Sequence, residues 1–134
     1  MRIPKITAVV FALCLATVAV AGSLDADGVP QVSMMRLLGS PEEFHGKRIR
    51  VIGFVHLEFE GDGIYLHRED FNQRIYKNGL WISALPEVRE KLQSLNDRYV
   101  FVEGIFRTDQ KGHMGLWSGS IMDVSIAFEW PPKR

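Results

Sequence analysis

The segment from Tyr65 to Trp81, YLHREDFNQRIYKNGLW, combines a histidine, carboxylates, basic side chains and aromatic rings within one short stretch of chain. Imidazole and carboxylate groups ligate divalent metals, cationic groups pair with anions, and aromatic rings stack on flat ligands. The same composition also suits a solvated connection, because alternating surface charges form local ion pairs of only about 0 to 1 kcal/mol each. The segment is therefore either a recognition site or a purely structural loop.

A recognition site here would draw on several complementary groups. Cationic side chains meet anionic ligands, aromatic rings cover flat or sugar faces, and an asparagine amide both donates and accepts hydrogen bonds. Arg74 and Tyr76 supply a further cation and a further ring. We expect the segment to bind an unidentified protein or an oligosaccharide of the cell envelope. The expected binding residues are His67, Arg68, Glu69, Lys77, Asn78 and Trp81.

An enzymatic alternative is a metal-assisted hydrolase centred on His56, His67 and Glu69. If the strand continues, His67 and Glu69 share one side and His56 lies on the neighbouring strand, which suits zinc or another divalent ion. Against this, the four histidines fall in different elements, and the chain has no HExxH spacing, GxSxG elbow or phosphate loop. We therefore expect a non-catalytic domain with no metal and no cofactor.

The amino end has the pattern of a secretory signal peptide over residues 1–21. Arg2 and Lys5 precede an uncharged run from Ile6 to Ala21, and Ala19-Val20-Ala21 supplies small residues for cleavage. The only cysteine, Cys14, lies inside this run, so the mature chain would have no thiol and no disulfide. We expect a periplasmic or secreted protein with no membrane span after cleavage.

The charge balance of the mature chain argues against a nucleic-acid partner. Without Arg2 and Lys5, 14 basic residues face 16 acidic ones, a net charge of −2. Binding to phosphates depends on a positive surface. Single-stranded nucleic acid thus stays only a further alternative, suggested by the barrel fold described next.

The chain after the signal peptide divides into three parts. Residues 22–31 are small and polar and are expected to form a flexible leader, residues 32–130 a single domain, and residues 131–134 a tail. The domain opens with two short helical signals, one capped by Ser33 and one with a Ser40-Pro41-Glu42-Glu43 capping box.

The pattern that follows predicts a mainly β domain. Residues 47–59 alternate as one long strand in which Gly53 marks a bend, and further strands are expected near residues 64–67, 80–85, 98–107 and 116–128. A single helix begins at Pro86, between strands three and four, and Gly104 lies within strand four. This order predicts a five-stranded OB-fold-like barrel with short N-terminal helices.

The motifs PEEFHGKRIRVIGF, YLHRED, KNGLW and YVFVEGIF, spread from about Val32 to Phe128, resemble those of a family of small exported bacterial proteins, most of them uncharacterised, with an OB-fold-like domain. The resemblance implies the fold and the compartment. It implies no catalytic residue and no ligand.

Overall fold

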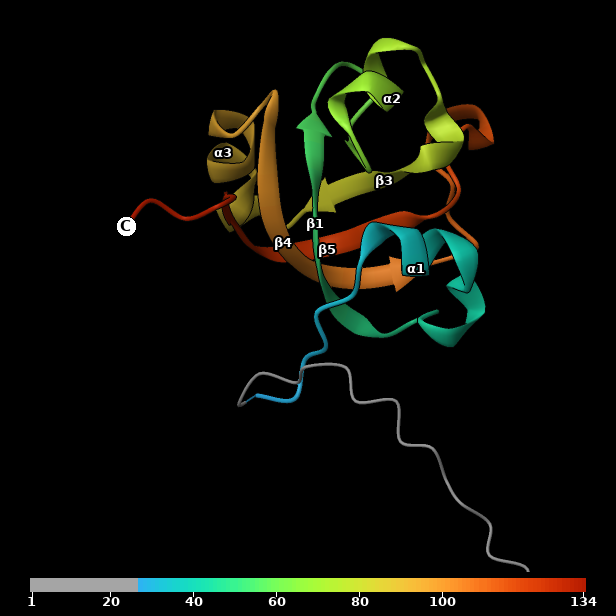
Figure 1. Ribbon diagram of the computed structural model, residues 1–134, viewed down its shortest axis with the longest axis horizontal. Helices are drawn as coiled ribbons and strands as arrows, with labels where there is room; N and C mark the ends of the chain where they lie inside the picture. Colours follow the sequence, from blue (N-terminus) through green and yellow to red (C-terminus); the bar gives the residue numbers. More distant parts are fainter. Residues whose placement is uncertain (1–26) are drawn as a thin grey trace, which may run out of the picture.

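The computed structural model describes residues 27–134, so the expected signal peptide and residues 22–26 lie outside the described part (Figure 1). Five strands form a closed barrel in the order β1-β2-β3-β5-β4, with every pairing antiparallel except β3 with β5. The strands are β1 (Arg48–His56), β2 (Gly63–Tyr65), β3 (Gly79–Ala84), β4 (Arg98–Arg107) and β5 (Ser120–Glu129). The predicted OB-fold-like barrel is confirmed.

Within residues 27–134, three short α-helices and three single 3-10 turns accompany the strands, and Figure 1 shows the helices around the outside of the barrel. The predicted helix between strands three and four is α3. The elements are α1 (Met34–Gly39), η1 (Pro41–Glu43), α2 (Arg68–Asn72), η2 (Tyr76–Asn78), α3 (Pro86–Ser94) and η3 (His113–Gly115).

The two predicted helix starts near the amino end differ in outcome. Ser33 caps α1 as predicted, since its Oγ accepts a hydrogen bond from the backbone N–H of Arg36 at 3.2 Å. The predicted capping box at Ser40 was wrong. The side chain of Ser40 makes no cap bond, and Glu43 instead pairs with Arg36 at 3.1 Å. The ion pair with α1 thus replaces the local cap.

The core fills the barrel with one face of each strand. Ile49, Val51 and Val55 of β1 are fully buried, as their alternation predicts, and Leu92 of α3 packs onto the same cluster. The first strand is shorter than expected because the chain turns away after His56. There, the backbone N–H of Leu57 donates to Asn96 Oδ1 at 2.7 Å, which replaces the pairing of a longer strand.

Gly53 and Gly104 lie where neighbouring strands approach closely. A Cβ on Gly53 would stand 2.7 Å from Ile64 Cγ1 and 2.8 Å from the Tyr65 carbonyl oxygen. A Cβ on Gly104 would stand 2.7 Å from Ile121 Cγ2. All three distances are far below a normal van der Waals contact, so the strands can approach this closely only where no side chain is present.

The side of β1 that faces away from β4 has a break at one residue. The backbone N–H of Arg50 donates to Pro30 and its carbonyl accepts from Val32, whereas Phe54 pairs with Tyr65 of β2. In an antiparallel ladder, alternate residues direct their backbone groups to the same side, so Ile52 points its N–H and C=O between these two partners. Among residues 27–134, no backbone partner fills that gap.

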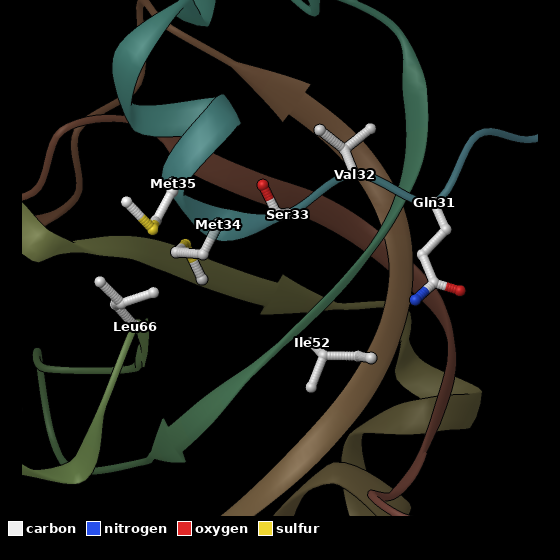
Figure 2. A pocket seen from close by; sticks show the side chains of 7 residues that line it. All are labelled: Gln31, Val32, Ser33, Met34, Met35, Ile52 and Leu66. Carbon is white, nitrogen blue, oxygen red and sulfur yellow. The ribbon is translucent and has the colours of Figure 1, made fainter. Parts of the chain in front are cut away.

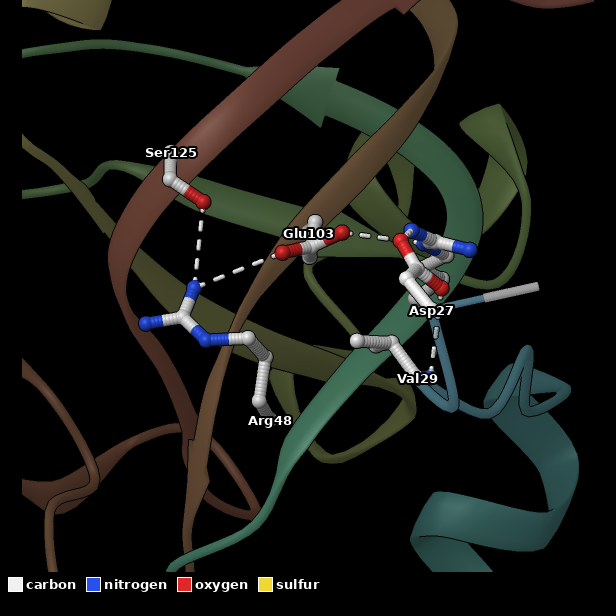
Figure 3. Close-up of polar contacts among 6 residues, drawn as sticks. Asp27, Val29, Arg48, Glu103 and Ser125 are labelled. Carbon is white, nitrogen blue, oxygen red and sulfur yellow. Dashed lines mark hydrogen bonds and ion pairs between the residues drawn. The ribbon is translucent and has the colours of Figure 1, made fainter. Parts of the chain in front are cut away.

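Residues 27–31, the last part of the expected leader, lie against the outside of β1. Arg50 donates to the Asp27 carboxylate, and this hydrogen bond lowers the pKa of Asp27 below its usual range. Arg50 Nε also donates to Glu103 Oε2 at 2.9 Å, and Arg48 lies 3.5 Å from the same carboxylate. Figure 3 shows Arg48, Glu103 and Asp27 side by side on the outside of the barrel. This network fastens the segment before α1 to β1 and β4.

Candidate functional site

The connection between β2 and β3, residues 66–78, folds into α2 and η2 around the carboxylate of Asp70. Asp70 is 8% exposed. Its Oδ2 accepts a hydrogen bond from the backbone N–H of His67 at 2.9 Å, and its Oδ1 accepts one from Asn78 Nδ2 at 2.8 Å. A carboxylate at this position satisfies a free N–H at the helix start and also holds the far end of the connection. Asn78, expected to bind a ligand, therefore has a structural partner.

Lys77, a second expected binding residue, joins this connection to the β4–β5 loop (residues 108–119). Its Nζ donates to the carbonyl oxygens of Gly115 and Trp117, each at 3.3 Å, and Ser118 Oγ donates to the Lys77 carbonyl at 2.7 Å. The ammonium group is exposed but already occupied by protein acceptors. Lys77 thus positions the loop rather than offering an unused charge.

Arg68 lies at the opposite end of the β2–β3 connection from Lys77 and has different contacts. Its guanidinium lies 5.1 Å from the centroid of the Phe54 ring, an arrangement that favours cation–π attraction. Its backbone N–H donates to the Tyr99 hydroxyl at 3.3 Å. Arg68 and Lys77 therefore contact different parts of the protein.

The other expected binding residues, His67, Glu69 and Trp81, also lie in different surroundings. His67 and Glu69 are exposed at the start of α2, whereas Trp81 is half-buried on β3 with its ring centroid 5.1 Å from that of Trp117. β2 ends at Tyr65 and α2 begins at Arg68, so the extended strand that would have placed His67 and Glu69 on one side is not formed.

Aromatic side chains fill the space beneath α2. Phe71 lies with its ring centroid 5.7 Å from that of Tyr65 and 6.3 Å from that of Phe54, and both partners are almost fully buried. Tyr76 of η2 packs edge-on against Trp117 at 5.2 Å. These rings occupy the outer face of β1 and β2, where the nucleic-acid alternative would require open stacking surfaces. The connection covers that face with its own side chains.

A pocket of about 400 Å³ lies between this connection and the β1–β2 loop (residues 57–62), and sequence reasoning did not find it. Arg74 is the notable cation there: among the described residues its side chain has no ion pair or hydrogen bond with the protein. Its backbone holds the left-handed conformation, φ 57°, which no signal in the sequence indicates. The lining residues are Glu58, Phe71, Asn72, Arg74 and Tyr76.

His56 lies next to this pocket, and its partners are not the His67 and Glu69 of the enzymatic alternative. Its Nδ1 is 2.6 Å from Asp97 Oδ1, its Nε2 is 3.7 Å from Glu58 Oε2, and its ring stacks on Phe71 at 3.8 Å. Within residues 27–134, no three His, Cys, Asp or Glu side chains are placed to hold a metal ion. His56, His67 and Glu69, the residues of the enzymatic alternative, are therefore not assembled into a metal centre in the described residues.

The β1–β2 and β4–β5 loops each expose a large apolar side chain. Phe59 in the β1–β2 loop is 91% exposed and Met114 in the β4–β5 loop is 81% exposed. The two loops are joined by Glu60 and His113, whose Oε2 and Nε2 atoms are 3.6 Å apart.

A second groove, also about 400 Å³, lies beside α1. Figure 2 shows Met34, Met35 and Leu66 close together on one side of it, with Ile52 on β1. The lining residues are Gln31, Val32, Ser33, Met34, Met35, Ile52 and Leu66, and none of them is charged. This groove therefore lacks the opposite charges, Glu58 and Arg74, that line the other pocket.

No protein-family model matches the chain, and no curated protein sequence matches it either. In the part of the chain that the structure describes, no helix has both the length and the apolar character needed to cross a membrane.

Proposed function

We propose that this protein is an exported, non-catalytic binding domain that recognises a ligand or a partner protein of the cell envelope through its β2–β3 connection. The observation that carries the proposal is the guanidinium of Arg74, which has no partner among residues 27–134 and which lines a pocket with Phe71 and Tyr76. A cation beside aromatic rings in a concave site is typical of ligand recognition.

The contacts of the neighbouring cations support the choice of Arg74. Lys77 is held by two carbonyl oxygens, and Arg68 lies over Phe54, so neither is as open to an incoming ligand. The binding residues therefore shift from the expected set toward Arg74, Tyr76 and Asn72. Phe59, which follows the pocket-lining Glu58 in the chain, adds an exposed apolar side chain to the β1–β2 loop.

The proposal is tested with the mature domain, residues 22–134, on arrays of envelope glycan fragments and of short peptides. We expect binding that falls about tenfold in Arg74→Ala and in Tyr76→Ala, since a few central side chains carry most of the affinity of an interface. Lys91→Ala, which removes an exposed charge from α3, is the matched control and should bind like the parent. Equal binding by the parent and Arg74→Ala, or no array signal for the parent, would contradict the proposal.

Export is tested separately. The charged start, apolar run and Ala-x-Ala end predict that the native protein begins near Gly22, which intact-mass analysis of the envelope fraction measures. Recovery of a cytoplasmic protein that retains Met1 would remove the compartment from the proposal.

A further inference from the structure

The pocket beside α2 presents two opposite charges that do not neutralise each other. Glu58 comes from the β1–β2 loop and Arg74 from the turn between α2 and η2, and both line the same space of about 400 Å³. Within the described residues, no ion pair joins them. An acidic and a basic residue therefore line the same pocket without being paired with each other.

Each charge is held by its own loop. The backbone N–H of Glu58 donates to Asp62 Oδ1 at 3.1 Å, and its carboxylate is half exposed, 3.7 Å from His56 Nε2. The backbone N–H of Arg74 donates to the Phe71 carbonyl at 2.9 Å, and the next N–H, of Ile75, donates to the Asp70 carbonyl at 2.7 Å. These bonds fix the backbone at both charges before any ligand arrives.

Aromatic rings lie at the pocket between the two loops. Phe71 is supported by stacking on His56, and Tyr76 by its edge contact with Trp117. Asn72 adds an amide that donates and accepts hydrogen bonds. The pocket thus offers an anion-binding group, a cation-binding group and an apolar surface, and its volume lies in the range of small-ligand sites, about 300 to 1,000 Å³.

We propose that this pocket binds a short peptide that has a free amino group and a free carboxylate. The amino group pairs with Glu58, the carboxylate with Arg74 and Asn72, and the apolar part of the peptide lies against Phe71 and Tyr76. This inference rests on the proposed function, because it specifies the ligand class of the same site. A dipeptide, whose terminal charges are separated, suits two charges on different loops better than a free amino acid does.

The inference is tested by two-dimensional NMR titration of residues 22–134 with alanyl-leucine. The comparison ligands are its N-acetyl form, its C-terminal amide and free leucine. We expect a millimolar Kd for the dipeptide, because exposed ion pairs contribute little affinity. Either blocked form should bind about fivefold more weakly, and the largest shifts should fall on the amides of Glu58 and Asn72 to Tyr76.

Charge-removing variants provide the decisive control. Arg74→Gln should bind the dipeptide and its amide equally, and Glu58→Gln should bind the dipeptide and its N-acetyl form equally, because each variant removes the group that distinguishes the pair. Lys91→Gln on α3 should behave like the parent. The melting temperature of each variant is measured to check that the fold is retained.

Two results would overturn the inference. One is equal binding of the dipeptide and both blocked forms by the parent, and the other is the absence of shifts at Glu58 and residues 72–76 at about 50 mM dipeptide. If either result occurs while an array ligand still depends on Arg74, only the ligand class is wrong. If the array signal is also absent, the proposed function fails as well. Stronger binding of free leucine than of the dipeptide would assign the site to a single amino acid.

Discussion

The indole Nε1 of Trp117 donates a hydrogen bond to the hydroxyl of Tyr65 at 3.2 Å, although 52 residues separate them in the chain. Both side chains are 1% exposed. The bond ties β2 to the β4–β5 loop inside the aromatic cluster beneath the β2–β3 connection. Because burial disfavours the phenolate, it raises the pKa of Tyr65 from its ordinary value of 10.0 to about 12.

This burial predicts a loss of stability at alkaline pH. The folded state keeps the Tyr65 proton to a higher pH than the unfolded state, so its contribution is fully present below pH 10 and is lost as the pH rises toward 12. The free energy of unfolding should fall by at most about 1.4 kcal/mol per pH unit in this range from Tyr65 alone.

Urea unfolding at several pH values between 9 and 12 measures this slope. Tyr65→Phe should remove the tyrosine contribution, whereas Tyr76→Phe, a half-buried control, should keep it. Parallel curves for the parent and Tyr65→Phe would show that the phenol is not held in its neutral form.

The close approach of strands at Gly53 predicts an intolerance of side chains there. Gly53→Val should destabilise the domain by about 1 to 3 kcal/mol, because its Cβ would press on Ile64 and on the Tyr65 carbonyl. Gly39 at the end of α1 has open space where a Cβ would lie, so Gly39→Ala is the control and should change stability by less than about 1 kcal/mol. Thermal melts compare the two, and equal melting temperatures would refute the close packing at Gly53.

The break beside Ile52 predicts a local difference in amide exchange. The N–H of Ile52 points away from β4, whereas the flanking residues Val51 and Gly53 direct theirs toward it. We expect the Ile52 amide to exchange with deuterium faster than both neighbours, since local opening is not needed to expose it. Hydrogen exchange resolved by residue, by NMR, measures this, and equal protection of all three amides would mean that a further group pairs with Ile52.

The two hydrogen bonds of Asp70 predict that it stabilises the connection. Asp70→Ala should lower the free energy of unfolding by about 1 to 3 kcal/mol, because it leaves the N–H of His67 and the amide of Asn78 without their acceptor. The neighbouring Glu69 is exposed, and Glu69→Ala should change stability by no more than about 0.5 kcal/mol. Chemical denaturation of the two variants distinguishes them, and similar losses would contradict the structural role of Asp70.

The strands were predictable because their side chains alternate between the core and the outside. Ile49, Val51 and Val55 follow that period, and Gly53 marks the crossing that a closed barrel requires. The site was less predictable because its partners come from distant parts of the chain. Nothing near His56 in sequence indicates that Asp97 will lie 2.6 Å from its Nδ1.

The sequence also did not indicate which cations of the β2–β3 connection would contact protein acceptors. Lys77 and Arg74 are both exposed cations, and they differ only because the carbonyl oxygens of Gly115 and Trp117 face Lys77. Such contacts depend on how the β4–β5 loop folds back, which side-chain patterns do not specify. The sequence placed Arg74 among the possible cations of the segment, but it did not indicate that Arg74, unlike Lys77, would have no side-chain partner among residues 27–134.

Because α2 lies on the outside of the barrel, its exposed side chains are separate from the side chains that pack the core. Phe71 anchors the helix on Phe54 and Tyr65, while the interior at Ile64 and Leu80 is packed by other strands and helices. Side chains on the solvent side of residues 68–76 can therefore change without disturbing the interior. Under the proposed function, evolution or a designed library restricted to those positions could vary the ligand while the scaffold keeps its stability.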